Sequence, residues 1–278
     1  MTPRECIREA ARAFCDAGIP DPVVDASALL ALVTGEAPLR LRLDGDRALT
    51  GDELARFSTL RDERLTRAPL QYLTHEQSFL GHSFYVDPRV LIPRPETELL
   101  AERAIAAAAR YPRPRVLDLC CGSGCLCVSA ALALPQAQVH GADMSRDALD
   151  VARRNADALG APVSFHQGDL LDAVAGLTFE VIVSNPPYIP DEECGALQEE
   201  VRREPAMALR GGADGLDFYR RIAAEAASYL APGGMLLLEA GYGQAEAIMA
   251  LLREHGLTDA AAYPDLQGIP RMVEACRP

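Results

Sequence analysis

Residues 1–75 carry hydrophobic patterns with helical spacing only. Thr2-Pro3-Arg4-Glu5 has the composition of a capping box with proline in the first turn, which predicts a helix start. Asp21-Pro22 opens a second helix that ends at Gly35, and Thr50-Gly51-Asp52-Glu53 opens a third. The short connections between these helices predict a small helical bundle. We interpret this bundle as a docking module or a lid.

The next twenty residues read as strand rather than helix. The runs Ser78–Val86 and Val90–Ile92 flank Asp87-Pro88, which predicts a β-hairpin with its turn between the two runs. We assign residues 76–95 to this hairpin linker. Pro93–Glu98 then ends the strand and starts a helix that continues through an alanine-rich stretch.

From residue 115 onward, short apolar runs alternate with helical patterns such as Asp147–Leu159 and Asp217–Leu230. Five runs have the length and composition of buried parallel strands, and the tail adds two shorter ones. The seven runs are Arg115–Leu119, Val139–Ala142, Val163–His166, Val181–Ser184, Met235–Glu239, Leu257–Tyr263 and Arg271–Ala275. Strands with interleaved helices predict a doubly wound, Rossmann-like α/β domain over residues 96–278.

The composition agrees with a two-domain globular protein. The 278 residues exceed the usual size of one domain, and 49% of them are hydrophobic. The sequence has no run of about 18 apolar residues and no charged-then-apolar leader. We therefore expect neither a membrane span nor a signal peptide, and a cytoplasmic location.

The chain is acidic, and its basic residues are all of one kind. The formal net charge is -13, and the 27 basic residues are all arginine. Duplex DNA requires a basic face that neutralises phosphates, so this balance argues against DNA as the main partner, whereas a basic protein remains suitable. The lack of lysine excludes catalysis by a lysine base or a Schiff base.

Four of the eight cysteines crowd into one short segment, as Cys120, Cys121, Cys125 and Cys127. Zinc sites usually combine two separated clusters, or a cysteine pair with a histidine pair, and His140 and His166 stand alone. We interpret these cysteines as small, buried, apolar side chains and expect no metal site.

The same segment contains a candidate cofactor loop. Cys120-Cys121-Gly122-Ser123-Gly124 follows the first predicted strand, where open α/β sheets bind ligands and glycine lets the backbone approach them. Asp143 ends the next strand, where a carboxylate can bind both ribose hydroxyls, and Asp169-Leu170 follows the third, near an adenine edge. Each aspartate alone is commonly a cap or turn residue. Together they predict an adenosine-bearing cofactor, with NAD and S-adenosylmethionine (SAM) both open.

Asn185-Pro186-Pro187-Tyr188, after the fourth strand, decides between these cofactors. The two prolines fix the backbone and remove two N–H donors. An NH2 group needs two acceptors, which the Asn185 side-chain oxygen and the Pro186 backbone oxygen can supply, while Tyr188 adds an aromatic wall. This predicts a SAM-dependent methyltransferase with catalytic Asn185, Pro186 and Tyr188, and with all four residues contacting a planar base or amide.

Several segments resemble the bacterial release factor glutamine methyltransferases, the PrmC or HemK family, over nearly the whole chain. They are Gln71-Tyr72, Phe79–Val86, Leu91–Glu98, Asn185–Tyr188, Glu204-Pro205 and Gly212–Arg220. One departure is clear. The family loop usually reads Asp-Leu-Gly-Thr-Gly-Ser-Gly, whereas Cys120 and Cys121 replace the first glycine and the threonine here. A cysteine at that place requires a backbone that tolerates a side chain, so we expect an altered affinity for SAM.

The resemblance implies a SAM-dependent protein glutamine N-methyltransferase that yields S-adenosylhomocysteine and uses no metal. Its substrate would be the glutamine in the Gly-Gly-Gln motif of peptide-chain release factors, docked by residues 1–75 on a monomeric enzyme. The ribosomal-protein glutamine methyltransferases, which often have cysteine in the loop, are the near alternative. An adenine DNA methyltransferase is a distant one, because it would need a basic recognition region.

Overall fold

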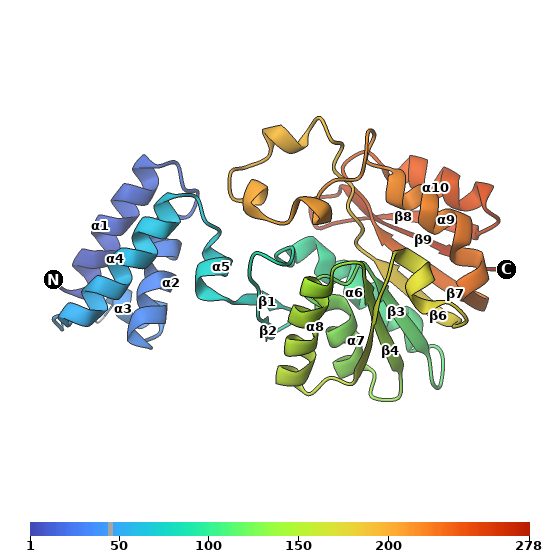
Figure 1. The fold of residues 1–278 in the computed structure, drawn as a ribbon, viewed down its shortest axis with the longest axis horizontal. Coiled ribbons are helices and arrows are strands. Elements are labelled where there is room, and N and C mark those ends of the chain that lie inside the picture. Colours follow the sequence, from blue (N-terminus) through green and yellow to red (C-terminus); the bar gives the residue numbers. More distant parts are fainter. Residues whose placement is uncertain (44–46) are drawn as a thin grey trace. The chain divides into compact units, whose positions relative to one another are not determined.

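The computed structural model describes residues 1–43 and 47–278, which form two compact units. The first unit contains Met1–Glu76 together with Gln198–Arg203, and the second contains Gln77–Leu197 together with Glu204–Pro278. Figure 1 shows helices in the first unit and a helix-covered sheet in the second. Among the described residues, no helix is both long and apolar enough to cross a bilayer.

The first unit is a helical bundle, as predicted. Its helices are α1 (Pro3–Asp16), α2 (Pro22–Thr34), α3 (Pro38–Leu43), α4 (Gly51–Leu65) and α5 (Leu70–Thr74). The capping boxes at Thr2 and Thr50 both form, and Gly35 ends α2 with a left-handed backbone. The sequence patterns missed α3 and α5, because helices of six and five residues are too short to show a periodic stripe.

A distant piece of the chain completes this unit. Arg64 is only 4% exposed, and its guanidinium donates to Asp25 at 2.8 Å and to Glu200 at 3.0 Å. Arg67 donates to the second oxygen of Glu200 at 2.7 Å, and Arg203 donates to the Thr66 carbonyl at 2.6 Å. Residues 198–203 therefore belong to the helical unit although they follow the predicted methyltransferase motifs in sequence.

The predicted hairpin exists, but its turn lies elsewhere. Strands β1 (Gln77–Phe79) and β2 (His82–Phe84) pair antiparallel in the second unit, joined by Leu80-Gly81. Both turn residues have positive φ, 47° and 76°, as a two-residue hairpin turn with the right-handed strand twist requires. The predicted turn at Asp87-Pro88 was wrong, since residues 88–92 form a turn and an irregular segment outside any strand.

All seven predicted strands of the α/β domain are confirmed. They are β3 (Arg115–Leu119), β4 (Gln138–Asp143), β5 (Val163–Gln167), β6 (Phe179–Ser184), β7 (Leu230–Glu239), β8 (Thr258–Pro264) and β9 (Pro270–Cys276). They form one sheet in the order β5-β4-β3-β6-β7-β9-β8, in which β9 runs antiparallel to β7 and β8. The chain leaves β3 towards β4 and later returns to its other side with β6. This change of direction opens a crevice at the carboxyl ends of the central strands.

Alternate residues of each strand pack into two cores. Val116, Val181 and Leu237 belong to the core beneath α6 (Pro95–Ala108), α7 (Cys125–Ala133) and α8 (Arg146–Leu159). Leu117 and Ile182 belong to the other core, beneath α9 (Asp217–Tyr229) and α10 (Ala245–Glu254). Short 3-10 turns complete the chain, at Leu170–Val174, Cys194–Ala196, Val201–Arg203 and Ala206–Ala208. The Rossmann-like fold is thus confirmed.

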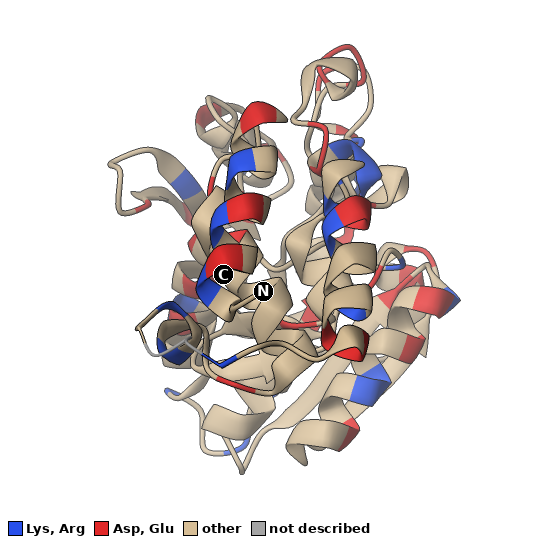
Figure 2. Cartoon of the chain, turned by 90° about the vertical axis from the view of Figure 1, so that its left-hand side faces the viewer, with Lys and Arg blue, Asp and Glu red and all other residues tan. Residues whose placement is uncertain are grey.

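Charged residues of both signs share the same helices. Figure 2 shows basic and acidic segments intermingled along them. Arg220 pairs with Asp214 and with Asp217 on α9, and Arg153 pairs with Asp150 on α8. These arginines are therefore engaged with neighbouring carboxylates.

Candidate active site

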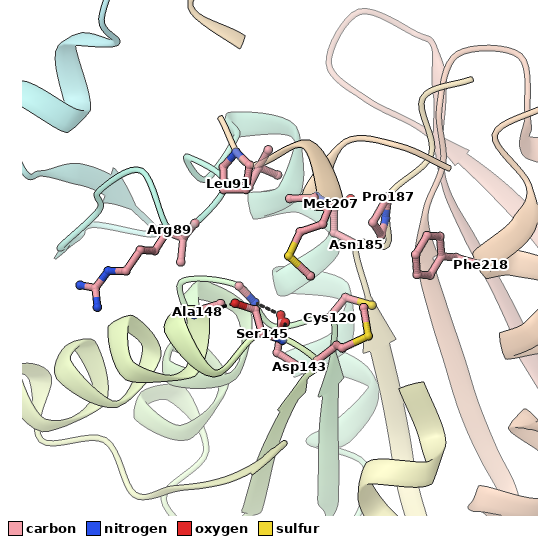
Figure 3. A pocket seen from close by; sticks show the side chains of 15 residues that line it. Arg89, Leu91, Cys120, Asp143, Ser145, Ala148, Asn185, Pro187, Met207 and Phe218 are labelled. Atoms are coloured by element: carbon pink, nitrogen blue, oxygen red, sulfur yellow. Dashed lines mark hydrogen bonds between the residues drawn. The ribbon is translucent and has the colours of Figure 1, made fainter. Parts of the chain in front are cut away.

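A cavity with about 600 Å³ of empty space opens at the carboxyl ends of β3, β4 and β6. Its polar lining includes Asp143, Ser145 and Asn185, and most other lining residues are apolar. In Figure 3, Leu91 and Met207 lie on one side of this hollow, with Asp143 and Cys120 opposite. A second cavity of about 380 Å³ shares four lining residues with the first: Leu91, Cys120, Gly122 and Asn185.

The two glycines of the loop serve different purposes. A Cβ added at Gly122 would meet nothing within 4 Å, so this residue faces the open cavity. A Cβ at Gly124 would lie 3.0 Å from the Cβ of Ala152 on α8. Gly124 therefore allows close packing of two elements, and it is not a lining residue of either cavity in the described chain.

Cys120 stands where the family loop usually has glycine, so its backbone conformation decides whether a side chain is tolerated there. Its φ is 61°, in the left-handed region, where a residue with a Cβ is strained. Its side chain lines both cavities. Cys121 lines only the smaller cavity; it is buried, and its N–H donates to the Ala142 carbonyl at 3.0 Å. The loop thus keeps its turn with a cysteine where the family usually has glycine.

Asp143 is held at the cavity wall by two backbone donors. One carboxylate oxygen accepts from the Gly122 N–H at 2.9 Å and the other from the Ser145 N–H at 2.8 Å. Burial raises the pKa of Asp143, although these hydrogen bonds oppose the shift. Each carboxylate oxygen can accept a second hydrogen bond, so the group is suited to a pair of neighbouring hydroxyls.

Asp169 and Leu170 lie outside both cavity linings in the described chain. The Asp169 carboxylate accepts from Arg221 at 2.8 Å, and Leu170 is buried with a positive φ of 49°. Their predicted contact with adenine stays a prediction.

The Asn185–Tyr188 segment is clamped by residues far along the chain. The Gln244 side chain donates to the Tyr188 carbonyl at 2.9 Å, and Ile189 exchanges backbone bonds with Leu209 and Gly211. A Cβ at Gly211 would approach the Tyr188 Cα to 2.7 Å. Glycine at this place, directly before the Gly212–Arg220 stretch, lets two backbone segments touch.

Within the segment, the four residues have different environments. Asn185 lines both cavities, and Pro187 lines the larger one. Pro186, which stands between these two residues in the sequence, is buried. Tyr188 is half-buried and packs against the core beneath α9, and its burial raises the pKa of its hydroxyl to about 12. Tyr188 is not a lining residue of either cavity in the described chain, so its role as an aromatic wall stays a prediction.

The Asn185 side chain is also hydrogen-bonded to a side chain of α6. Its Nδ2 donates to the Thr97 hydroxyl at 3.3 Å, and that hydroxyl donates to a Glu239 carboxylate oxygen at 2.6 Å. Burial raises the pKa of Glu239 to about 7, against the opposing effect of the bond from Thr97. Thr97 was not predicted as a site residue, although it lies in one of the segments that carry the resemblance.

The segment containing Thr97 is anchored by a second glutamate. The Glu204 side chain is almost completely buried, and it accepts from the Ile92 N–H at 3.0 Å and from the Arg94 guanidinium at 2.5 Å. This joins Leu91–Glu98 to Glu204-Pro205, two stretches of the resemblance that are over 100 residues apart. Pro205 itself and the nearby Met207 and Ala208 line the larger cavity.

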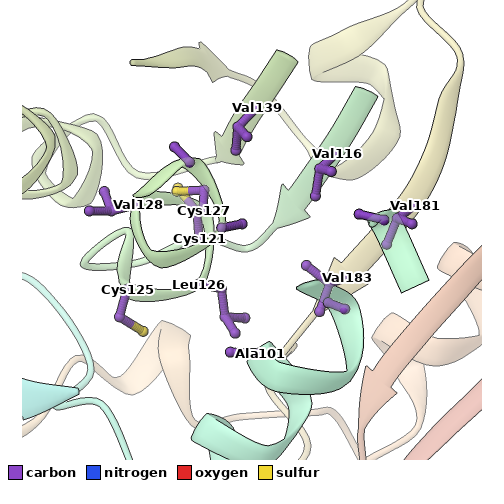
Figure 4. Close-up of a cluster of buried hydrophobic side chains, with 14 of the residues drawn as sticks. Ala101, Val116, Cys121, Cys125, Leu126, Cys127, Val128, Val139, Val181 and Val183 are labelled. Carbon is purple, nitrogen blue, oxygen red and sulfur yellow. The ribbon is translucent and has the colours of Figure 1, made fainter. Parts of the chain in front are cut away.

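The remaining loop cysteines belong to the core, as expected. Cys121, Cys125 and Cys127 are buried, and Figure 4 shows Cys121 and Cys127 near Val139 and Val128. Burial raises the pKa of the Cys127 thiol to about 11. Within residues 1–43 and 47–278, no group of three or more His, Cys, Asp and Glu side chains is placed to hold a metal ion.

Other lining residues were missed by sequence reasoning. They come from the segment before α6, from the residues around the start of α8, from the loop that precedes α9 and from the first turn of α9: Arg89, Val90, Leu91, Met144, Ser145, Ala148, Pro205, Met207, Ala208 and Phe218. Met144 directly follows Asp143, so its place was open to inference. Met207 carried no local signal, because only the fold brings it to the cavity.

Two family models match the chain. Residues 5–74 match the PrmC N-terminal domain, and residues 96–213 match the methyltransferase small domain. A release factor glutamine methyltransferase of Deinococcus radiodurans is 42% identical over 277 residues, covering 100% of this chain and 99% of its own. The corresponding protein of Geobacter sulfurreducens is 42% identical, with 94% and 91% covered.

A related enzyme and solved structures complete the comparison. A ribosomal protein uL3 glutamine methyltransferase of Bordetella pertussis is 44% identical, covering 81% of this chain and 73% of its own. A methyltransferase structure from Pyrococcus furiosus aligns with a TM-score of 0.53 at 17% identity, covering 78% of this chain and 98% of its own. A 16S rRNA methyltransferase of T. thermophilus aligns with a TM-score of 0.51 at 21% identity, covering 73% and 50%. At these identities the structures support the fold alone.

Proposed function

The chain belongs to the release factor glutamine methyltransferase family, and we propose that it methylates the side-chain nitrogen of the glutamine in the Gly-Gly-Gln motif of peptide-chain release factors. The methyl donor is SAM and the protein product carries N-methylglutamine. One observation carries the proposal: Asn185 lines two adjoining cavities, so one side chain can face both reactants.

The larger cavity fits SAM by the chemistry of its lining. The Asp143 carboxylate suits the ribose hydroxyls, and Gly122 keeps the backbone free of a Cβ beside the cofactor. Leu91, Met144 and Met207 offer apolar surface to the adenine. We assign Cys120, Gly122, Asp143 and Asn185 to cofactor binding. Cys121, Ser123 and Gly124 are retained as sequence-based predictions for the cofactor loop, and Asp169-Leu170 for the adenine edge.

The protein's part in the chemistry is orientation. When bound, SAM supplies a strongly electrophilic methyl group. An amide nitrogen is a weak nucleophile because its lone pair is delocalised, and its protons are too weakly acidic for a carboxylate to remove beforehand. Asn185 and Pro186 hold the two N–H groups through their oxygens, so that the nitrogen faces the methyl group. The proton leaves to water after transfer, and we assign no general base.

The ribosomal-protein reaction is the second candidate, because the uL3 enzyme is 44% identical over much of the chain. The release factor reaction is better supported by relatives that match over 94% and 100% of the chain, helical unit included. DNA is a weaker candidate, since the net charge is -13.

A labelling experiment separates these substrates. Purified release factor, ribosomal protein uL3 and DNA are each incubated with methyl-labelled SAM and the enzyme. We expect label on the release factor, and none on a release factor whose Gly-Gly-Gln glutamine is replaced by alanine. Label on uL3 alone, or on DNA alone, would overturn the assignment.

A further inference from the structure

Two buried side chains next to Asn185 have no part in the reaction described so far: Thr97, which also lines the smaller cavity, and Glu239. Thr97 is the third residue of α6, and Glu239 is the last residue of β7. Each is only 3% exposed. The Tyr219 hydroxyl donates to the Glu239 carbonyl at 2.7 Å, which fixes this strand end. The two side chains thus form a fixed support for whatever they contact.

The hydrogen bonds of this support have only one possible direction when Glu239 is ionised. A carboxylate only accepts, and a threonine hydroxyl has a single proton to give. At 2.6 Å from Glu239, that proton is committed to the carboxylate, so the Thr97 oxygen can only accept from Asn185. The Asn185 NH2 group must then face Thr97, as it does at 3.3 Å.

We propose that Thr97 and Glu239 are positioning residues that turn the Asn185 side chain so that its oxygen, not its NH2 group, faces the substrate amide. The substrate identity in this proposal rests on the proposed function. The two ends of an asparagine amide have nearly the same size, so packing alone selects weakly between them. Without the Thr97 hydroxyl, the NH2 group can turn towards the substrate, and two donors would then face each other.

The orientation can be observed without any substrate. The chain contains two asparagines, Asn155 and Asn185, so selective ¹⁵N-asparagine labelling gives two side-chain amide signal pairs. Asn155 donates to the Tyr85 and Ser123 carbonyls and serves as an internal reference. At pH 8, Thr97→Val should move the Asn185 pair and leave the Asn155 pair in place, and Thr97→Ser should restore the wild-type position. Unchanged Asn185 signals in Thr97→Val would overturn the proposal.

Kinetics then test whether the orientation matters for transfer. Thr97→Val should slow single-turnover methyl transfer about tenfold or more, with the Kd for SAM within about twofold, and Thr97→Ser should recover most of the rate. Because Thr97 acts through Asn185, adding Thr97→Val to Asn185→Ala should change the rate less than about twofold. Thr258→Val, which removes an exposed hydroxyl on β8, is the matched control. An equal loss in both backgrounds would refute the coupling.

These outcomes are distinguishable from failure of the proposed function. If wild-type enzyme labels uL3 instead of the release factor, the same variants are compared on uL3, and only the substrate assignment falls. If the release factor is labelled but Thr97→Val is as active as wild type, only the positioning role falls.

Discussion

Removing the Asp143 carboxylate should weaken SAM binding by about 10- to 100-fold. Both carboxylate oxygens already accept one backbone N–H, at 2.9 and 2.8 Å, which aims their remaining acceptor positions at the cavity. A hydrogen bond to a charged acceptor contributes about 1.5–3 kcal/mol, and 1.4 kcal/mol is a factor of ten in Kd. Losing one such bond to a ribose hydroxyl therefore gives this range, and losing two would weaken binding further.

The same substitution should also reduce stability. Asp143→Ala leaves the Gly122 and Ser145 N–H groups without their partner, which costs about 1–3 kcal/mol if water does not replace it. Titration calorimetry gives the Kd for SAM, and urea denaturation without SAM gives the free energy of unfolding. Asp150→Ala, which removes an exposed carboxylate from α8, should change neither. A folded Asp143→Ala protein with a Kd within about threefold of wild type would refute the ribose role.

Three further predictions concern stability. Burial raises the pKa of Asp118 and of Glu239 to about 7. Between about pH 5 and 7 the folded protein therefore holds protons on these two carboxyls that the unfolded chain has lost, whereas above about pH 7 the carboxyls ionise in both states. The free energy of unfolding should fall as the pH rises from 5 to 8, by a few kcal/mol at most, and less steeply in Glu239→Gln. A rise over this range in urea titrations would contradict it. Gly211→Ala should lower stability by about 1–3 kcal/mol, because the added Cβ would meet the Tyr188 backbone. Gly195→Ala is the control, since a Cβ there meets nothing within 4 Å. Equal melting temperatures for the two variants would refute the clash. Cys120→Gly relieves the strain of a left-handed residue with a Cβ, worth about 1–2 kcal/mol, but adds conformational entropy to the unfolded chain, worth about 0.4–1 kcal/mol. Urea denaturation should therefore show a gain in stability between zero and about 1.6 kcal/mol, and a clear loss would contradict the strain.

The sheet could be predicted from the sequence because its central strands β3, β6 and β7 contain short apolar runs that are buried on both faces. Arg115–Leu119 was located without error, and the other six were located to within a few residues except at the start of β7. The hairpin turn was misplaced because Leu80 has a positive φ, and a leucine in the sequence gives no indication of such a backbone conformation. Helices as short as α3 and α5 also lack a readable period.

The site was only partly predictable, for a physical reason. Cys120, Gly122, Asp143 and Asn185 stand directly after strands, so their meeting at one sheet edge follows from the topology. Thr97 contacts Asn185 across 88 residues of sequence, and Met207 reaches the cavity through a loop whose middle belongs to the helical unit. Such contacts depend on tertiary packing, which local patterns do not encode.

The central claim is that Asn185 orients the substrate amide, and single-turnover methyl transfer to the release factor by Asn185→Ala tests it most directly. The Kd for SAM is measured on the same protein. Since misplacing a reacting group can cost about 100-fold, we expect a rate at least that much lower, with SAM binding mostly intact. An Asn185→Ala enzyme that transfers methyl groups at close to the wild-type rate would contradict the account.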